Sequence, residues 1–219
     1  EEFGKGYGIS KSVISRKTVE ATAEQLRTLC ERDLSTLDIC VLVIDGVHVA
    51  ETVHIVALGV ETSGKKHIFG VRQGATENSQ VCTELFEEME QRGLHAERAV
   101  LVVIDGSKAL RSAVDRFFGK RAVVQRCQVH KCSNVLHHLP DRYHAEYARK
   151  IHSAYSMTSY DDAKRVLEMT IEQLQRINES AARSLEEGLE ETLTVHRLQV
   201  PGVLRTSCCR SNVIESAFS

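Results

Sequence analysis

The sequence predicts an α/β protein in which a mixed β-sheet is flanked by helices and followed by an all-helical segment. Residues 39–126 alternate short apolar runs, rich in β-branched side chains, with stretches of helical periodicity. Eleven of the 13 glycines precede residue 120, where short elements need turns between them. The two prolines, Pro140 and Pro201, bound a long stretch of helical periodicity. The 219 residues suffice for one core and a small subdomain but not for three domains.

The first three strands are predicted by apolar runs that turn signals separate. Residues 39–44 form a compact apolar run that ends at Asp45-Gly46, and residues 47–60 contain many β-branched side chains. A Glu-Thr-Ser-Gly turn over 61–64 precedes a third strand over 66–71. Because consecutive strands with short connections usually pair, we expect a meander.

Helices and strands then alternate along the chain. A helix begins within 74–78 and ends at Gly93, which is a typical C-cap residue. A fourth strand over 99–104 ends in a second Asp-Gly pair, and a helix over 107–118 ends at a glycine before a fifth strand over 122–125. The order β-β-β-α-β-α-β implies a mixed sheet with helices on its faces.

The stretch between the two prolines is predicted to be helical throughout. Its apolar residues recur at steps of three, four and seven, with Glu and Arg around them, which predicts a single buried stripe. We interpret the stripe as the core of a helical subdomain; it consists of Leu167, Ile171, Leu174, Ala181, Leu185 and Leu189.

A short basic helix is predicted within residues 7–23, with Ser10 as its N-cap and Val13, Ile14 and Val19 on one face. Two interpretations stay open. The segment is either the second helix of a DNA-binding helix-turn-helix or an ordinary solvated basic face.

The composition is that of a globular protein, with 42% hydrophobic and 26% charged residues and a formal net charge of −2. These values exclude disordered, collagenous and coiled-coil chains. The sequence has no apolar run long enough for a membrane span, and its first residues lack the pattern of a signal peptide. Seven cysteines without an export signal predict reduced thiols in a cytoplasmic protein.

Charge is distributed unevenly along the chain. Residues 105–135 carry seven Lys or Arg against two acids, a net charge of +5, and residues 161–191 carry nine acids against four bases, a net charge of −5. The basic strip fits contact with DNA phosphates. The alternative for either run is a solvated helix face.

The most informative feature is a repeat, Leu42-Val-Ile-Asp-Gly and Val102-Val-Ile-Asp-Gly, which places Asp45 and Asp105 after two buried strands. If these strands are parallel neighbours, the two aspartates stand side by side and repel each other unless a divalent cation lies between them. Hard oxygen ligands suit Mg²⁺ or Mn²⁺, and two such ions about 3.5–4 Å apart promote phosphodiester chemistry. The alternatives are a hairpin turn at Asp45-Gly46 and a helix N-cap at Asp105.

A two-metal site usually needs a third carboxylate, and Glu215 is the candidate. Ser211 or Asn212 would cap a short helix that carries Glu215 in its first turn. The alternative is an ordinary acidic residue that stabilises a helix N-terminus.

Several motifs closely resemble those of mutator-type bacterial insertion-sequence transposases. They are Asp45-Gly-Val-His, Asp105-Gly-Ser-Lys-Ala-Leu-Arg, Phe118-Gly, Val124-Gln-Arg-Cys-Gln-Val-His-Lys, Asn134-Val-Leu-His-His-Leu-Pro and the terminal Ser-Asn-Val-Ile-Glu215-Ser. The resemblance covers nearly the whole chain. It implies an RNase H-like core with the catalytic triad Asp45, Asp105 and Glu215, interrupted by an all-helical insertion before the glutamate.

The resemblance also implies a domain layout, cofactors and partners. Residues 1–36 would end an N-terminal DNA-binding region, 37–139 would form the catalytic core, 140–205 the insertion and 206–219 the start of the helix with Glu215, so that the chain is truncated at both ends. The triad would hold two Mg²⁺ or Mn²⁺ ions, with Asp45 on the central strand bridging both. The partners would be transposon ends and target DNA, which the protein would bind as a dimer. It would be a cytoplasmic protein associated with the nucleoid and would have no membrane partner.

Cys127 and His130 match the family's Cys-x-x-His signature, which by resemblance lies near the active site and handles DNA. We expect Lys108, Arg126 and Lys131 of the basic strip to contact DNA as well. The competing interpretation is a zinc site. It would use Cys127, His130 and Cys132, with Cys208-Cys209 as further ligands, although this spacing matches no standard zinc motif.

We therefore predict a DNA transposase core that performs metal-dependent phosphodiester cleavage and strand transfer of an insertion sequence. Three alternatives remain: an RNase H-like nuclease that cuts without strand transfer, an inactive remnant that only binds DNA or partner chains, and a Rossmann-like nucleotide binder. The last is disfavoured because neither Asp-Gly pair is part of a glycine-rich phosphate loop.

Overall fold

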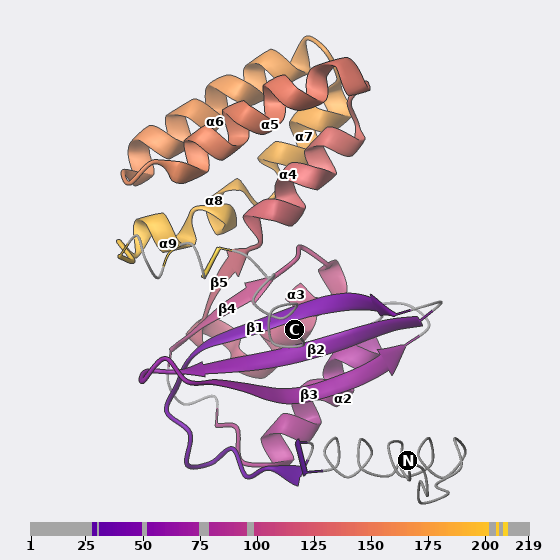
Figure 1. Cartoon of the computed structure of the whole chain (residues 1–219), viewed down its shortest axis with the longest axis vertical. Helices are drawn as coiled ribbons and strands as arrows, with labels where there is room; N and C mark the ends of the chain where they lie inside the picture. Colours follow the sequence, from indigo (N-terminus) through magenta and orange to yellow (C-terminus); the bar gives the residue numbers. More distant parts are fainter. Residues whose placement is uncertain are drawn as a thin grey trace, which may run out of the picture.

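The computed structural model describes residues 28–29, 31–49, 52–74, 79–95, 99–201, 205 and 208–209. The chain forms two adjoining parts, a sheet with two helices and a group of helices (Figure 1). We call β1–β5 with α2 and α3 the sheet part, and α4–α9 the helical part. The predicted N-terminal helix within residues 7–23 and Glu215 lie outside the described residues.

The sheet has five strands in the order β3-β2-β1-β4-β5. They are β1 (Ile39–Val49), β2 (Thr52–Glu61), β3 (Lys66–Gly74), β4 (Val100–Ile104) and β5 (Ala122–Arg126). The first three strands form an antiparallel meander, whereas β4 and β5 run parallel to β1. The predicted fold class is confirmed, because a mixed sheet flanked by helices in this order is compatible with an RNase H-like fold. The central strand is β1.

Two helices cover one face of the sheet. They are α2 (Ser79–Gln91) and α3 (Lys108–Phe118), and a short 3₁₀ turn, η1 (Gly119–Arg121), leads from α3 into β5. Alternate strand residues such as Leu42, Ile44 and Val102 point toward the helices and share one apolar core with Leu85 and Phe118. The chain leaves α2 at Gly93, whose φ of +89° favours glycine, as the C-cap signal predicted.

The first strand differs from its prediction, because β1 does not end at Asp45-Gly46. In the antiparallel ladder with β2, Asp45 pairs with Val56 and Gly46 pairs with Ile55, and pairing continues to Val49. The long, β-branched second strand gives the backbone groups of residues 46–49 partners, so the strand extends. Asp45-Gly46 is therefore not a hairpin turn, and this alternative is excluded.

The helical part is a separately packed bundle of short helices. It contains α4 (Gln128–His137), η2 (Asp141–Tyr143), α5 (His144–Ser156), α6 (Tyr160–Gln175), α7 (Glu179–Glu186), α8 (Leu189–Thr192) and α9 (Thr194–Arg197). All six residues of the predicted apolar stripe are buried in its core. The stripe crosses three helices rather than one, because Asn178 caps a new helix and Gly188, with φ of +67°, turns the chain before α8. In the described parts of the chain, no helix is both long and apolar enough to cross a membrane.

Candidate active site at the ends of the parallel strands

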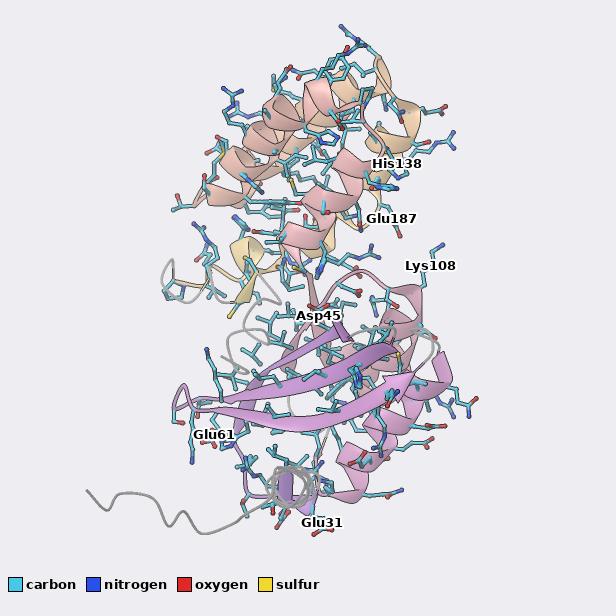
Figure 2. The ribbon with its side chains drawn as sticks, turned by 45° about the vertical axis from the view of Figure 1, so that its right-hand side comes forward. Glu31, Asp45, Glu61, Lys108, His138 and Glu187 are labelled. Carbon is cyan, nitrogen blue, oxygen red and sulfur yellow. The ribbon has the colours of Figure 1, made fainter. Side chains whose placement is uncertain are left out.

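The two aspartates of the repeat stand at the same level of the sheet. Parallel pairing between β1 and β4 ends with Ile44 opposite Ile104, and Asp45 and Asp105 are the next residues on the two neighbouring strands. Asp45 has only 8% of its surface exposed, whereas Asp105 is partly exposed. In Figure 2, Asp45 lies where the sheet part faces the helical part. The predicted juxtaposition of the two carboxylates is thus what the strand register produces.

Main-chain amides orient both carboxylates. The Gly46 amide donates to Asp45 Oδ1 at 3.0 Å, and the Ser107 amide donates to Asp105 Oδ1 at 2.8 Å. The N-cap of α3 is Ser107, whose hydroxyl accepts from Leu110, so Asp105 is not the cap. Asp105 instead sits in the turn that leads from β4 into α3.

A histidine that follows β5 lies close enough to the two aspartates for their charges to act on it. His130 lies in the first turn of α4, which follows β5 directly. Its pKa is raised to about 9, first by a hydrogen bond to the Cys127 side chain and then by the negative charges of Asp45 and Asp105, while burial opposes the rise. The negative charges of both carboxylates therefore favour the protonated form of His130. The turn itself is fixed because the Cys127 amide donates to Ile104 O at 2.7 Å.

The donor set fits a hard divalent cation rather than zinc. Two carboxylates in register offer the oxygen ligands that Mg²⁺ and Mn²⁺ prefer. No group of three or more His, Cys, Asp or Glu side chains arranged to hold a metal occurs among the residues that the structure describes. Cys132 points into the core of the helical part, where burial raises its pKa to about 11, so it stays a thiol. Cys127, His130 and Cys132 thus do not form a zinc site.

The end of the described chain returns to this site. The Gln128 amide, at the start of α4, donates to Cys209 O at 2.9 Å, and Cys209 is buried. This contact gives the Cys209 backbone a structural role that the sequence did not indicate. Glu215 follows six residues later, outside the described residues.

Two of the predicted DNA contacts face the helical part instead. Arg126 Nε donates to Glu191 Oε2 at 2.7 Å, and its guanidinium lies 3.4 Å from Glu187 Oε1. Lys131 Nζ donates to Ser184 O at 2.6 Å and to Glu187 O at 2.7 Å. Both side chains are buried. Their positive charges are used within the protein, whereas Lys108, in the first turn of α3, is exposed.

The basic strip and the acidic run therefore neutralise each other in part. Arg111 of α3 also joins the cluster, donating to Glu191 Oε1 at 2.9 Å and pairing with Asp115. Sequence reasoning treated the two runs as separate surfaces, because residues 65 positions apart, such as Arg126 and Glu191, carry no local signal of pairing. We call Arg111, Arg126, Lys131, Glu187 and Glu191 the charged interface.

Sequence reasoning also missed a buried glutamine beside this interface. Gln125 is fully buried in β5; its amide nitrogen donates to Thr192 O at 2.9 Å, and its Oε1 accepts from the Val195 amide at 3.0 Å. Thr194 adds a hydroxyl bond to Val124 O at 2.6 Å. A single glutamine in an apolar strand was the available signal, since a buried amide needs partners.

Two glycines enclose Arg126. A Cβ atom on Gly188 would lie 2.6 Å from Arg126 Cζ, and one on Gly106, the residue after Asp105, would lie 3.6 Å from an Arg126 guanidinium nitrogen. Arg126 thus lies between the turn that carries Asp105 and the turn that begins α8. The helical part is tied through this side chain to the candidate active site.

Comparison with known proteins finds one transposase family and several of its relatives. The family described as "Transposase, Mutator family" matches residues 1–218. The transposase for insertion sequence element IS6120 of Mycolicibacterium smegmatis is 32% identical over 171 residues, which cover 75% of this chain and 52% of the relative. The transposase for IS905 of Lactococcus lactis is 27% identical over 219 residues, covering 96% of this chain and 54% of the relative. The chain spans about half the length of these curated relatives.

Proposed function

Because the chain belongs to the mutator family of transposases, we propose that its sheet part is the catalytic core of a DNA transposase. In this proposal the core cuts a phosphodiester bond at the end of an insertion sequence and joins the freed end to target DNA. The observation that carries the proposal is the register of the parallel strands. It puts Asp45 and Asp105 side by side, with His130 in the field of both.

The two aspartates are proposed to hold a pair of divalent cations. Mg²⁺ or Mn²⁺ ions, when bound, would supply Lewis-acid stabilisation to the attacking and leaving oxygens of a phosphodiester. Asp45 lies on the central strand, between β2 and β4, and its carboxylate would be one of the ligands. Asp105 sits at the start of α3, so the Ser107 amide keeps its carboxylate oriented.

Glu215 is proposed as the third carboxylate. The hydrogen bond from the Gln128 amide to Cys209 O holds Cys209 beside the start of α4, where His130 lies two residues further along. Glu215 follows Cys209 by six residues. Six residues span up to about 20 Å, so the chain length permits a return to the aspartates. The proposed domain layout follows: a core over residues 37–139, an insertion over 140–205 and the start of a final helix over 206–219.

His130, Cys127 and Lys108 are proposed to act on the DNA. His130 donates a hydrogen bond and positive charge where a scissile phosphate would approach the aspartates, while Cys127 positions the imidazole. Lys108 is exposed one turn beyond Asp105 and suits a phosphate contact.

A cleavage assay with Asp45→Ala tests the proposal. With a duplex that carries the insertion-sequence end and with Mn²⁺, we expect the variant to lose strand cleavage by about a thousandfold or more, with little change in thermal stability. Asp161→Ala, an exposed acid in the first turn of α6, is the matched control and should cut normally. Normal cleavage by Asp45→Ala would refute the assignment.

A strand-joining assay and a metal titration separate the competing functions. A pre-cut end supplied with target DNA should be joined by a transposase but not by a nuclease that only hydrolyses. An inactive remnant would show neither cleavage nor a Mn²⁺-dependent rise in the unfolding midpoint, whereas the proposed site should show both.

A further inference from the structure

Helix α4 has two chemically different faces. Gln128, Lys131, Cys132 and Val135 are buried and face the rest of the protein. The opposite face carries His130, Asn134 and His137, which follow one another at steps of four and three residues and therefore share one side of the helix. This polar row begins at the aspartates, through His130, and leads away from them along the helical part.

The outer end of this row opens into a groove between α4 and α7. The groove has a volume of about 530 Å³ and is lined by Asn134, His137, His138, Ser180, Arg183 and Ser184. In Figure 2, His138 and Glu187 lie on the same side of the molecule as Lys108, with Asp45 at the level between the two parts. Two residues of the groove lining thus lie on the side of the molecule on which the sheet part exposes Lys108.

Most of the side chains that line the groove can donate hydrogen bonds. Two imidazoles, an amide, two hydroxyls and a guanidinium come from its two walls, and the side chains of Asn134, His137, His138 and Arg183 are exposed. Glu187 also lines the groove, and its carboxylate lies 3.4 Å from Arg126 and 3.8 Å from Lys131, which offset part of its charge. A donor-rich, open and polar groove suits the oxygens of a phosphate backbone.

We propose that the groove between α4 and α7 binds the sugar-phosphate backbone of one DNA strand, on the path of that strand out of the active site. The inference rests on the proposed function, because it takes the aspartates as the place where the strand is cut. A helix rises 1.5 Å per residue, so the row from His130 to His137 spans about 10 Å. A duplex strand advances about 3.4 Å per nucleotide, so the groove would contact the backbone about three nucleotides from the scissile phosphate.

The inference is tested by measuring how tightly the 219-residue chain binds a fluorescently labelled DNA duplex. Fluorescence anisotropy gives the affinity at each salt concentration of a series. The triple variant Asn134→Ala/His137→Ala/His138→Ala should bind about tenfold more weakly or worse, because three exposed donors to phosphate are removed. His152→Ala, an exposed histidine on α5 outside the groove, is the control and should bind as the unaltered chain does.

A second, charge-based pair of variants measures phosphate contact directly. Arg183 of α7 and Arg165 of α6 have 74% and 70% of their side chains exposed, and each pairs with an acid about one turn earlier. Arg183→Gln should reduce the slope of log affinity against log salt by about one, whereas Arg165→Gln should leave the slope unchanged. Because both arginines are solvated, neither variant should alter folding.

The outcomes are distinct from those of the cleavage assay. Unchanged affinity in the triple variant and an unchanged salt slope in Arg183→Gln would overturn the groove inference, even if Asp45→Ala abolishes cleavage. Loss of binding in the groove variants, together with normal cleavage by Asp45→Ala, would support the groove and refute the catalytic assignment.

Discussion

Two pairs of carboxylates lie near the end of β5, and their surroundings differ. Glu187 and Glu191 come from the helical part and meet Arg111, Arg126 and Lys131 in the charged interface. Asp45 and Asp105 come from the sheet part, are oriented by main-chain amides and act together on His130. Within the described part of the chain, no lysine or arginine nitrogen lies within 4.0 Å of the Asp105 carboxylate.

The difference separates a structural use of negative charge from a chemical one. In the charged interface, the glutamates neutralise cations that are buried, which holds two parts of the molecule together. At the strand ends, two carboxylates are held close despite their like charges, an arrangement that costs stability unless a cation is bound. We therefore expect the first pair to matter for stability and the second for activity.

The largest stability effect is expected from the double variant Glu187→Gln/Glu191→Gln. It leaves Arg126 and Lys131 buried without charge neutralisation, and the free energy of unfolding should fall by about 3 kcal/mol. Chemical denaturation measures this loss. Asp45→Asn/Asp105→Asn is the matched control in metal-free buffer and should change the unfolding free energy by less than about 1 kcal/mol. If the two double variants lost equal stability, the distinction between the pairs would fail.

The next effect is expected at Gly188, which lies directly against the Arg126 guanidinium. Gly188→Ala places a Cβ atom 2.6 Å from Arg126 Cζ and strains a residue with φ of +67°, so we expect a loss of about 2 kcal/mol. Gly64 is the control, because it also has a positive φ, +85°, but no neighbour within 4 Å of the added atom. Gly64→Ala should cost about 1 kcal/mol, from backbone strain alone. Equal losses in thermal or denaturant unfolding would show that Arg126 does not need the space.

The sheet part could be predicted from sequence because its signals are local. Apolar runs, Asp-Gly pairs and glycines at helix ends gave the seven elements in the correct order, and the repeat around Asp45 and Asp105 gave their common level in the sheet. The one error in β1 arose because pairing with β2 carries the strand past Gly46. A local turn signal was overridden by hydrogen bonds to a neighbouring strand.

The charged interface could not be predicted because its partners are far apart along the chain. A net charge of +5 over residues 105–135 suggested a surface for DNA, yet Arg126 and Lys131 are buried against the helical part. Counting charges along a segment does not show which side chains face solvent. Lys108 stays a predicted DNA contact, and Glu215 stays a predicted carboxylate ligand outside the described residues.

A smaller effect is expected when Lys131 is replaced by methionine. Lys131 donates to Ser184 O and Glu187 O at the end of α7, so Lys131→Met leaves two carbonyls without these donors and should cost about 1.5 kcal/mol. Lys108→Met, at an exposed position, should be neutral within about 0.5 kcal/mol. If both variants unfolded at the same denaturant concentration, the buried lysine would not contribute to the interface.

The smallest effect concerns pH and sharpens the contrast between the two environments through a second histidine. His196 of α9 is buried, and its Nε2 lies 3.1 Å from Tyr155 O. Burial, and then the positive charge of Arg205, lower its pKa below the usual 6.5, opposite to the rise at His130 beside the aspartates. The unfolded chain therefore takes up a proton before the folded chain does as pH falls. The contribution of His196 to stability should be fully present above the unfolded pKa and should decrease as the pH falls from about 6.5 toward the folded pKa.

Denaturant unfolding across this range should show a weaker pH dependence in His196→Gln than in the unaltered chain, because the variant lacks this titration. Identical slopes in both proteins would mean that His196 takes up its proton equally in the folded and unfolded states.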